Sequence, residues 1–270
     1  MSDIGALANV SNAAAGQLVK RLVSRLLLPS WLKQPGVRKY LKKKRTIAMH
    51  RMHNVPKTAS GPETTGATIH WASQYDIFTS LLGLGVNRPN SRMIVEMAKI
   101  EPGDNVLDVG CGTGNLTLTA QRYAGASGSA YGIDASPEMI AVAQKKARSS
   151  GSGTAFEVGL IEAIAYPDAT FDVVISRLVI HHLPDDLKRQ GFKEIYRVLK
   201  PGGVFFLADF KPPANPILAH VTSALVGPRM MQYSVSAIPP LLAEAGFVDV
   251  ASGPTRSAFL AFVSGKKPTS

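Results

Sequence analysis

The chain has 270 residues, a formal net charge of +11 and a single cysteine, Cys111. One cysteine excludes an internal disulfide, and no apolar run reaches the ~18 residues that a membrane span requires. The six histidines and the cysteine form no pair at zinc-ligand spacing, so we expect no metal site. The length suits one large core with an extension.

The positive charge is concentrated in the first 62 residues. Met1–Pro62 holds twelve of the 30 Lys and Arg residues but only one of the 19 Asp and Glu residues. Within it, apolar side chains recur at helical spacing over Ala13–Leu28, and the basic cluster Arg38–Arg45 follows. We therefore expect a basic, helical N-terminal extension over 1–62, joined through the linker-like stretch Asn54–Gly66 to a domain over 63–270.

Several partners suit this extension. A basic amphipathic helix with a polybasic cluster is typical of a segment that lies on an anionic membrane surface. An acid-poor amphipathic start is also typical of an organellar transit peptide, and the helix could instead simply pack on the domain. We expect no nucleic-acid partner, because the extension has no interleaved aromatic residues for base stacking. The expected location is intracellular, either cytoplasmic or organellar, and peripheral to a membrane.

After the linker, helical and strand-like segments alternate, which is typical of a mostly parallel sheet covered on both faces. The expected strands are Asn105–Val109, Ala130–Ile133, Ala155–Gly159, Phe171–Ser176, Val204–Ala208, Phe247–Ser252 and Ala258–Ser264. Helices are expected over Ile69–Leu84 and Ser91–Lys99, up to Tyr123 and Ser149 after the first two strands, and over Asp186–Leu199 and Ile238–Ala245. The short connection Gly253–Arg256 predicts that the last two strands form an antiparallel hairpin.

The first strand runs directly into a turn with glycines at 110, 112 and 114. Such a turn lets the backbone approach a ligand where a Cβ atom would obstruct it. The third glycine comes one residue too early for a dinucleotide fingerprint, which disfavours a nicotinamide-dependent reductase. Asp134 ends the second strand, and Ser136 is typical of a helix N-cap. Because parallel strands end at one edge, the turn and Asp134 should share a crevice, where the carboxylate can bind a ribose.

These motifs, in this order, resemble the class I S-adenosylmethionine-dependent methyltransferases, and most closely the branch of the ubiquinone and menaquinone biosynthesis C-methyltransferases. The resemblance covers Thr68 to Pro268 and rests on Val106–Gly114, Gly132–Met139, Phe171–Ser176, Arg197–Gly203 and Leu241–Phe247. It implies an α/β fold with a Rossmann-like, seven-stranded, mostly parallel sheet, helices on both faces and a C-terminal antiparallel hairpin. It also implies S-adenosyl-L-methionine as the cofactor.

The resemblance further implies where that cofactor binds. Asp108 and the backbone at Gly110 would meet its amino-acid end, and Asp134 its ribose. Family members usually carry an acid just after the third strand, where this chain has Leu160, so Glu162 or a backbone carbonyl is expected to substitute. The expected cofactor-binding residues are Tyr75, Asp108, Gly110, Cys111, Gly112, Gly114, Asp134, Ala135, Met139, Ile161, Glu162 and Ser176. Tyr75 would either stack near the sulfonium or pack in the core.

The candidate catalytic residues are His181 and His182, which follow the fourth strand at the edge where the transferred methyl group should lie. Either could act as a base near neutral pH, or only order the turn. We expect a small, lipophilic or aromatic acceptor, methylated on carbon or oxygen. Methylation of a polar metabolite or natural product, and a non-catalytic scaffold that binds a membrane or protein partner, remain alternatives. Lys211–Ser236 is expected to wall the substrate pocket.

Overall fold

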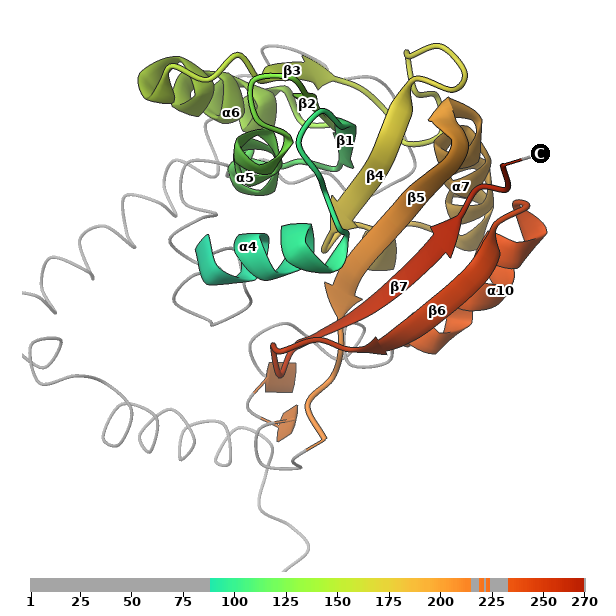
Figure 1. Cartoon of the computed structure of the whole chain (residues 1–270). Coiled ribbons are helices and arrows are strands. Elements are labelled where there is room, and N and C mark those ends of the chain that lie inside the picture. Colours follow the sequence, from blue (N-terminus) through green and yellow to red (C-terminus); the bar gives the residue numbers. More distant parts are fainter. Residues whose placement is uncertain (1–87, 215–218, 221, 224–232, 270) are drawn as a thin grey trace, which may run out of the picture. The chain divides into compact units, whose positions relative to one another are not determined.

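The computed structural model describes residues 88–214, 219–220, 222–223 and 233–269 (Figure 1). The expected N-terminal extension, the linker, the helix Ile69–Leu84 and Tyr75 lie outside the described residues. No helix within these ranges is both long and apolar enough to cross a bilayer. The same ranges contain no group of three or more His, Cys, Asp or Glu side chains placed to hold a metal ion.

The described residues build one seven-stranded sheet in the order β3-β2-β1-β4-β5-β7-β6 (Figure 1). The strands are β1 (Asn105–Val109), β2 (Ser129–Asp134), β3 (Ala155–Val158), β4 (Phe171–Arg177), β5 (Leu199–Phe210), β6 (Val248–Pro254) and β7 (Leu260–Lys266). Pairings from β3 to β5 are parallel, and β7 is antiparallel to both β5 and β6. The predicted Rossmann-like sheet with a C-terminal hairpin is confirmed. The strand order reverses between β1 and β4, which is where open parallel sheets bind ligands.

β1 has the expected bounds, and the other strands differ from theirs, most of all β5 and the two hairpin strands. β5 begins at Leu199 and not at Val204, because Leu199 already pairs with Phe171 before a register shift, after which Val204 pairs with Val173. The hairpin strands β6 and β7 each end two residues later than expected, so that Thr255–Phe259 forms the connection. The hydroxyl of Thr255 closes this turn by donating to the Leu260 carbonyl at 2.8 Å.

Helices cover both faces of the sheet, as predicted (Figure 1). Apolar side chains of α4 (Arg88–Met97) and α5 (Asn115–Ala124) form one core cluster with β1, β2, β4 and β5. The helix α6 (Pro137–Ser150) packs a smaller cluster that includes Cys111 and Phe156. On the opposite face, α7 (Asp185–Val198) and α10 (Ile238–Glu244) bury the largest cluster. The sheet is therefore buried from both sides, which leaves the carboxyl ends of its parallel strands as the place where a ligand is expected.

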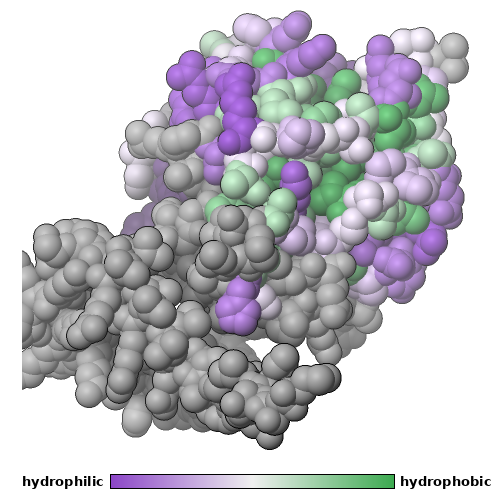
Figure 2. All heavy atoms as spheres, turned by 90° about the horizontal axis from the view of Figure 1, so that it is seen from below, coloured by the Kyte–Doolittle hydropathy of each residue, from purple (hydrophilic) through white to green (hydrophobic). Residues whose placement is uncertain are grey.

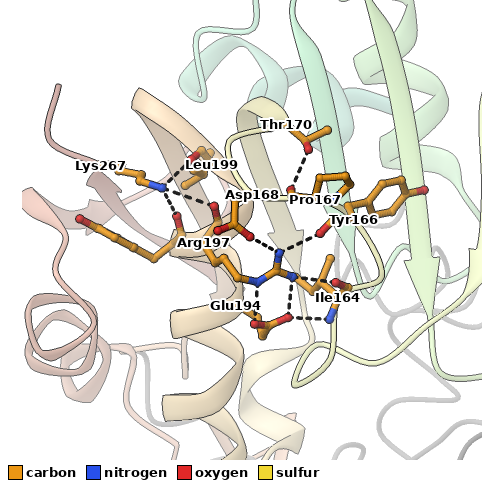
Figure 3. Close-up of polar contacts among 10 residues, drawn as sticks. Ile164, Tyr166, Pro167, Asp168, Thr170, Glu194, Arg197, Leu199 and Lys267 are labelled. Atoms are coloured by element: carbon orange, nitrogen blue, oxygen red, sulfur yellow. Dashed lines mark hydrogen bonds and ion pairs between the residues drawn. The ribbon is translucent and has the colours of Figure 1, made fainter. Parts of the chain in front are cut away.

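A cluster of ion pairs fastens α7 to the loop before β4 (Figure 3). The guanidinium of Arg197 donates at 2.7–2.9 Å to the carboxylates of Glu194 and Asp168 and to the carbonyls of Ile164 and Tyr166. Lys267, just after β7, donates to carbonyl oxygens at the end of the same helix. These contacts lie where β4 and β5 begin, at the edge opposite the predicted ligand site. We therefore assign these contacts a role in stability and not in ligand binding.

Candidate active site

Three glycines shape the turn between β1 and α5. Gly110, Gly112 and Gly114 have φ of +73°, +52° and +80°, a region that favours glycine. A Cβ atom on Gly110 would lie 2.2 Å from Cγ2 of Val179, and one on Gly114 would lie 2.7 Å from Cζ of Phe156. A Cβ atom on Gly112 would meet no atom of the described residues within 4 Å. Packing inside the protein is therefore what excludes a side chain at Gly110 and Gly114, and Gly112 is the position that borders open space.

Asp108, on β1, is a buried carboxylate that is only half satisfied. Its Oδ2 accepts a hydrogen bond from the hydroxyl of Thr117 at 2.6 Å, and its Oδ1 is buried without a partner among the described residues. Burial raises the pKa of Asp108 to about 6, although the Thr117 hydrogen bond and the charge of Arg177 oppose the shift. A buried oxygen of this kind costs free energy unless a donor or a cation reaches it.

Asp134, at the end of β2, lies directly against the glycine turn. Its Oδ2 accepts from the Gly112 amide and its Oδ1 from the Ser136 amide, both at 2.9 Å. The predicted N-cap is confirmed, because the hydroxyl of Ser136 accepts from the Met139 amide at the start of α6. Ala135 follows Asp134 directly, and Met139 is buried in the first turn of α6. Burial raises the pKa of Asp134. The expected meeting of the turn and Asp134 in one place is confirmed.

The remaining expected cofactor residues end β3 and β4. Leu160 and Glu162 are half-buried in the turn after β3, and Ile161 is buried in the core. A Cβ atom on Gly191 of α7 would lie 2.6 Å from Cγ1 of Ile161, so this turn and α7 are in close contact. The hydroxyl of Ser176 on β4 donates to the Val109 carbonyl at 2.8 Å and so links the ends of β4 and β1. All these residues lie at the carboxyl edge of the sheet.

His181 forms a buried pair with Asp209. Its Nδ1 lies 2.5 Å from Oδ1 of Asp209, and its backbone amide donates to Oδ2 at 3.0 Å. Asp209 also accepts from the Phe210 amide at 2.8 Å and from the hydroxyl of Tyr233 at 3.2 Å. If the carboxylate accepts from Nδ1, the lone pair of the neutral ring is on Nε2. That Nε2 is buried without a partner among the described residues.

Two residues of this arrangement, Asp209 and Tyr233, were not predicted from the sequence. Asp209 is the residue directly after the expected end of β5, and an acid at the carboxyl end of a parallel strand was the available signal. Tyr233 lies in Lys211–Ser236, for which the sequence predicts only that it walls the substrate pocket. No local pattern links either residue to His181. Asp209 reaches it because β4 and β5 lie side by side, and Tyr233 is 52 positions away in the sequence.

His182 and Cys111 occupy different settings from His181. The His182 ring lies 3.9 Å from that of His181, centroid to centroid, and desolvation together with the neighbouring ring lowers the pKa of His182. His182 is therefore a neutral imidazole near pH 7. Burial raises the pKa of the Cys111 thiol, so this side chain is a protonated, packed group in the turn.

Comparison with known proteins assigns the chain to a family. Residues 106–203 match the family of methyltransferase domains. A ubiquinone/menaquinone biosynthesis C-methyltransferase from Geobacter sulfurreducens is 33% identical over 183 residues, which cover 67% of this chain and 69% of that protein. The chain belongs to the class I S-adenosylmethionine-dependent methyltransferases. A demethylmenaquinone methyltransferase from Lactobacillus johnsonii is 35% identical over 151 residues, 54% of this chain and 60% of that protein.

The relationship to these methyltransferases is distant. The chain spans less than two thirds of the length of several of the curated relatives it matches, with shares of 58% to 64%. A methyltransferase from Aquifex aeolicus of known structure matches with a TM-score of 0.58 and 21% identity, over 73% of this chain and 99% of that one. At that identity the structural match supports the fold alone.

The residues at the carboxyl edge fit the cofactor of this methyltransferase family. The unpartnered Oδ1 of Asp108 suits a cationic donor such as an amino-acid ammonium group. The open space beside Gly112 admits a ligand against the backbone, and Asp134 lies at that same point. We refer to Asp108, Gly112 and Asp134 together as the cofactor cradle.

Proposed function

We propose that the chain transfers a methyl group from S-adenosylmethionine to a carbon or oxygen atom of a small lipophilic or aromatic acceptor. The observation that carries the proposal is that the buried His181–Asp209 pair and the cofactor cradle share the carboxyl edge of adjacent strands. The similarity to quinone C-methyltransferases supports this class of acceptor.

Each part of the cradle has a distinct binding role in this proposal. When bound, the cofactor supplies an electrophilic methyl group on a positively charged sulfur. Asp108 accepts hydrogen bonds from the ammonium of the amino-acid end through Oδ1. Asp134 binds the ribose hydroxyls while the Gly112 and Ser136 amides fix its carboxylate. Glu162, half-buried after β3, takes the place of the acid that Leu160 replaces.

His181 is the base in this proposal, and Asp209 and Tyr233 position it. Methylation of a phenol or of a ring carbon requires the removal of a proton, and Nε2 of His181 carries the free lone pair that can accept it. Asp209 holds the ring tautomer and stabilises the imidazolium that forms, because its carboxylate binds Nδ1 directly. Alignment of the reactants in a site that excludes water supplies a further several kcal/mol.

Calorimetry and methyl-transfer assays together test the proposal. S-adenosylmethionine should bind with micromolar affinity, and Asp134→Ala should weaken that binding. With methyl-labelled cofactor and a panel of quinols and phenols, His181→Ala should lower the transfer rate by about 10²- to 10⁴-fold while cofactor affinity stays unchanged. His182→Ala is the matched comparison and should lower the rate far less. Transfer to polar metabolites alone would overturn the acceptor class.

The replacement of the usual acid by Leu160 favours one other function, a non-catalytic scaffold that binds a membrane or protein partner. A scaffold has no need for a base with a fixed tautomer. The absence of any detectable heat on titration with S-adenosylmethionine, for a chain that is folded by circular dichroism, would support the scaffold and overturn the enzyme.

The basic N-terminal extension adds a second part to this proposal, binding to an anionic membrane surface. The twelve basic residues of Met1–Pro62 give about 1 kcal/mol each when they lie near such a surface. Co-sedimentation with vesicles that contain phosphatidylserine should pellet the full chain, and 0.5 M salt should release it. Equal pelleting of a chain without residues 1–62 would contradict this role.

A further inference from the structure

A cavity lies at the carboxyl edge beside the His181–Asp209 pair, which we call the catalytic pair. It has a volume of about 450 Å³ and lies between the segment after β5, the short 3-10 helix η3 (Val235–Ala237) and the β6–β7 hairpin. A volume of this size is within the range of small-molecule sites. Figure 2, which views the molecule from below Figure 1, shows apolar residues gathered among hydrophilic ones on the coloured part of that face.

Tyr233 connects this cavity to the catalytic pair. Its ring lines the cavity, and its hydroxyl donates to Oδ2 of Asp209. The ring centroids of Tyr233 and His181 are 5.7 Å apart. Desolvation and the charge of Asp209 raise the pKa of Tyr233, so its hydroxyl stays a proton donor. A molecule that packs against this ring therefore lies one aromatic ring away from the base.

The described residues that line the cavity carry positive charge and no negative charge. Among the described residues that line the cavity, Lys211 is the charged one and none is a carboxylate. Lys211 forms no ion pair with another described residue. The nearby Lys188 lies 5.9 Å from the Tyr233 ring, but Asp185 already neutralises it at 2.8 Å. An anionic group on a ligand would thus find one unpaired cation and no repelling acid.

The rest of the lining is apolar or hydroxylic. Phe262 contributes an aromatic wall and stacks on Phe206 behind it, with ring centroids 5.6 Å apart and an interplanar angle of 5°. Val235 adds an aliphatic side chain, and Ser252 adds a hydroxyl. Aromatic walls with a few polar groups are typical of pockets that bind a flat ring and fix its orientation.

We propose that this cavity binds the methyl acceptor and that the acceptor is an aromatic acid. The ring packs between Phe262 and Tyr233, and the carboxylate pairs with Lys211. This inference rests on the proposed methyltransferase function and deepens it, because it names the chemical class of the acceptor. A neutral ring of the same size would gain the packing but would leave Lys211 unpaired.

Two small probes test the inference on the full chain. The first, 1-hydroxy-2-naphthoate, carries a ring and a carboxylate, and the second, 1-naphthol, lacks the carboxylate. By calorimetry the acid should bind at least tenfold more tightly than the naphthol. Lys211→Gln should remove that preference to within twofold, and Lys211→Arg should keep it. Lys266→Gln, at the far end of β7 and outside the lining, is the matched control and should change nothing.

A substitution of Phe262 separates the contribution of aromatic packing to probe binding from the contribution of charge. Phe262→Leu keeps an apolar contact on Phe206 and should weaken the binding of both probes by a similar factor, because both lose the aromatic wall. Equal binding of the two probes to the unaltered chain, or a preference for the acid that survives Lys211→Gln, would overturn the inference.

S-adenosylmethionine is titrated into the same samples to keep the two proposals apart. If the cofactor binds but the naphthoate does not, the acceptor class is wrong and the methyltransferase function stands. If the cofactor fails to bind to the folded chain, the proposed function fails, whatever the probes do.

Discussion

Val179 occupies the space that a side chain on Gly110 would need. A Cβ atom built on Gly110 lies 2.2 Å from Cγ2 and 2.9 Å from Cγ1 of Val179, closer than atoms can approach. The two residues follow β1 and β4, which are neighbours in the sheet. The glycine turn and the segment that carries His181 are thus packed against each other, and a change on one side acts on the other.

Gly110→Ala should destabilise the chain by about 3 kcal/mol, because it combines overpacking with a left-handed backbone. Val179→Ala in the same chain removes both Cγ atoms and should restore about 1–2 kcal/mol of that loss. Urea denaturation of the two single variants and the double variant measures this coupling. Strictly additive losses would show that the two residues do not compete for the same space.

Gly112→Ala should reduce the stability only slightly but should weaken cofactor binding strongly. A Cβ atom there meets no atom of the described part of the chain within 4 Å, and the left-handed backbone opposes it at a cost of about 1 kcal/mol. The same methyl group points into the space that we assign to the cofactor, and S-adenosylmethionine should bind at least tenfold more weakly. Calorimetry on the folded variant measures the affinity, and an unchanged dissociation constant would place the cofactor elsewhere.

The raised pKa of Asp108 predicts how stability depends on pH. The folded chain holds the Asp108 proton up to about pH 6, and the unfolded chain releases it near pH 4, so this group's stabilising contribution is lost as pH rises through 6. Asp108→Asn abolishes that loss. The free energy of unfolding of the variant, relative to the unaltered chain, should therefore rise by roughly 1 kcal/mol between pH 5 and pH 8. Urea titrations at the two pH values measure the difference, which should otherwise be constant.

Cofactor binding should depend on the same proton. If the ammonium of S-adenosylmethionine pairs with Oδ1 of Asp108, binding favours the carboxylate form, and the affinity should rise about tenfold from pH 5 to pH 7. Calorimetry at pH 5 in two buffers of different ionisation enthalpy should also detect the release of a proton. A pH-independent affinity would contradict this role for Asp108.

Arg197→Met should destabilise the chain by about 1–3 kcal/mol without affecting cofactor affinity. The substitution removes the guanidinium that donates to the Glu194 carboxylate and to the carbonyls of Ile164 and Tyr166, and leaves Glu194 only the Ile164 amide among the described donors (Figure 3). Arg189→Met is the matched control, because Arg189 forms a single exposed pair with Glu244 and should cost less than about 0.5 kcal/mol. Thermal melts compare the two variants, and equal losses would show that the Arg197 cluster adds no special stability.

The sequence by itself determined the fold class and one half of the site. Alternating apolar segments predict the parallel sheet because period and length are local properties, and the glycine turn, Asp134 and the Ser136 cap could be placed because each follows a strand directly. Only the tertiary structure distinguished the two histidines, because His181 and not His182 pairs with a carboxylate. Asp209 lies 28 positions beyond His181 and reaches it because β4 pairs with β5, and Tyr233, 52 positions beyond His181, donates to the same carboxylate. The tertiary structure also decided why the glycines are needed, since the side chains that exclude a Cβ atom at Gly110 and Gly114 come from distant segments, and no local pattern encodes such contacts.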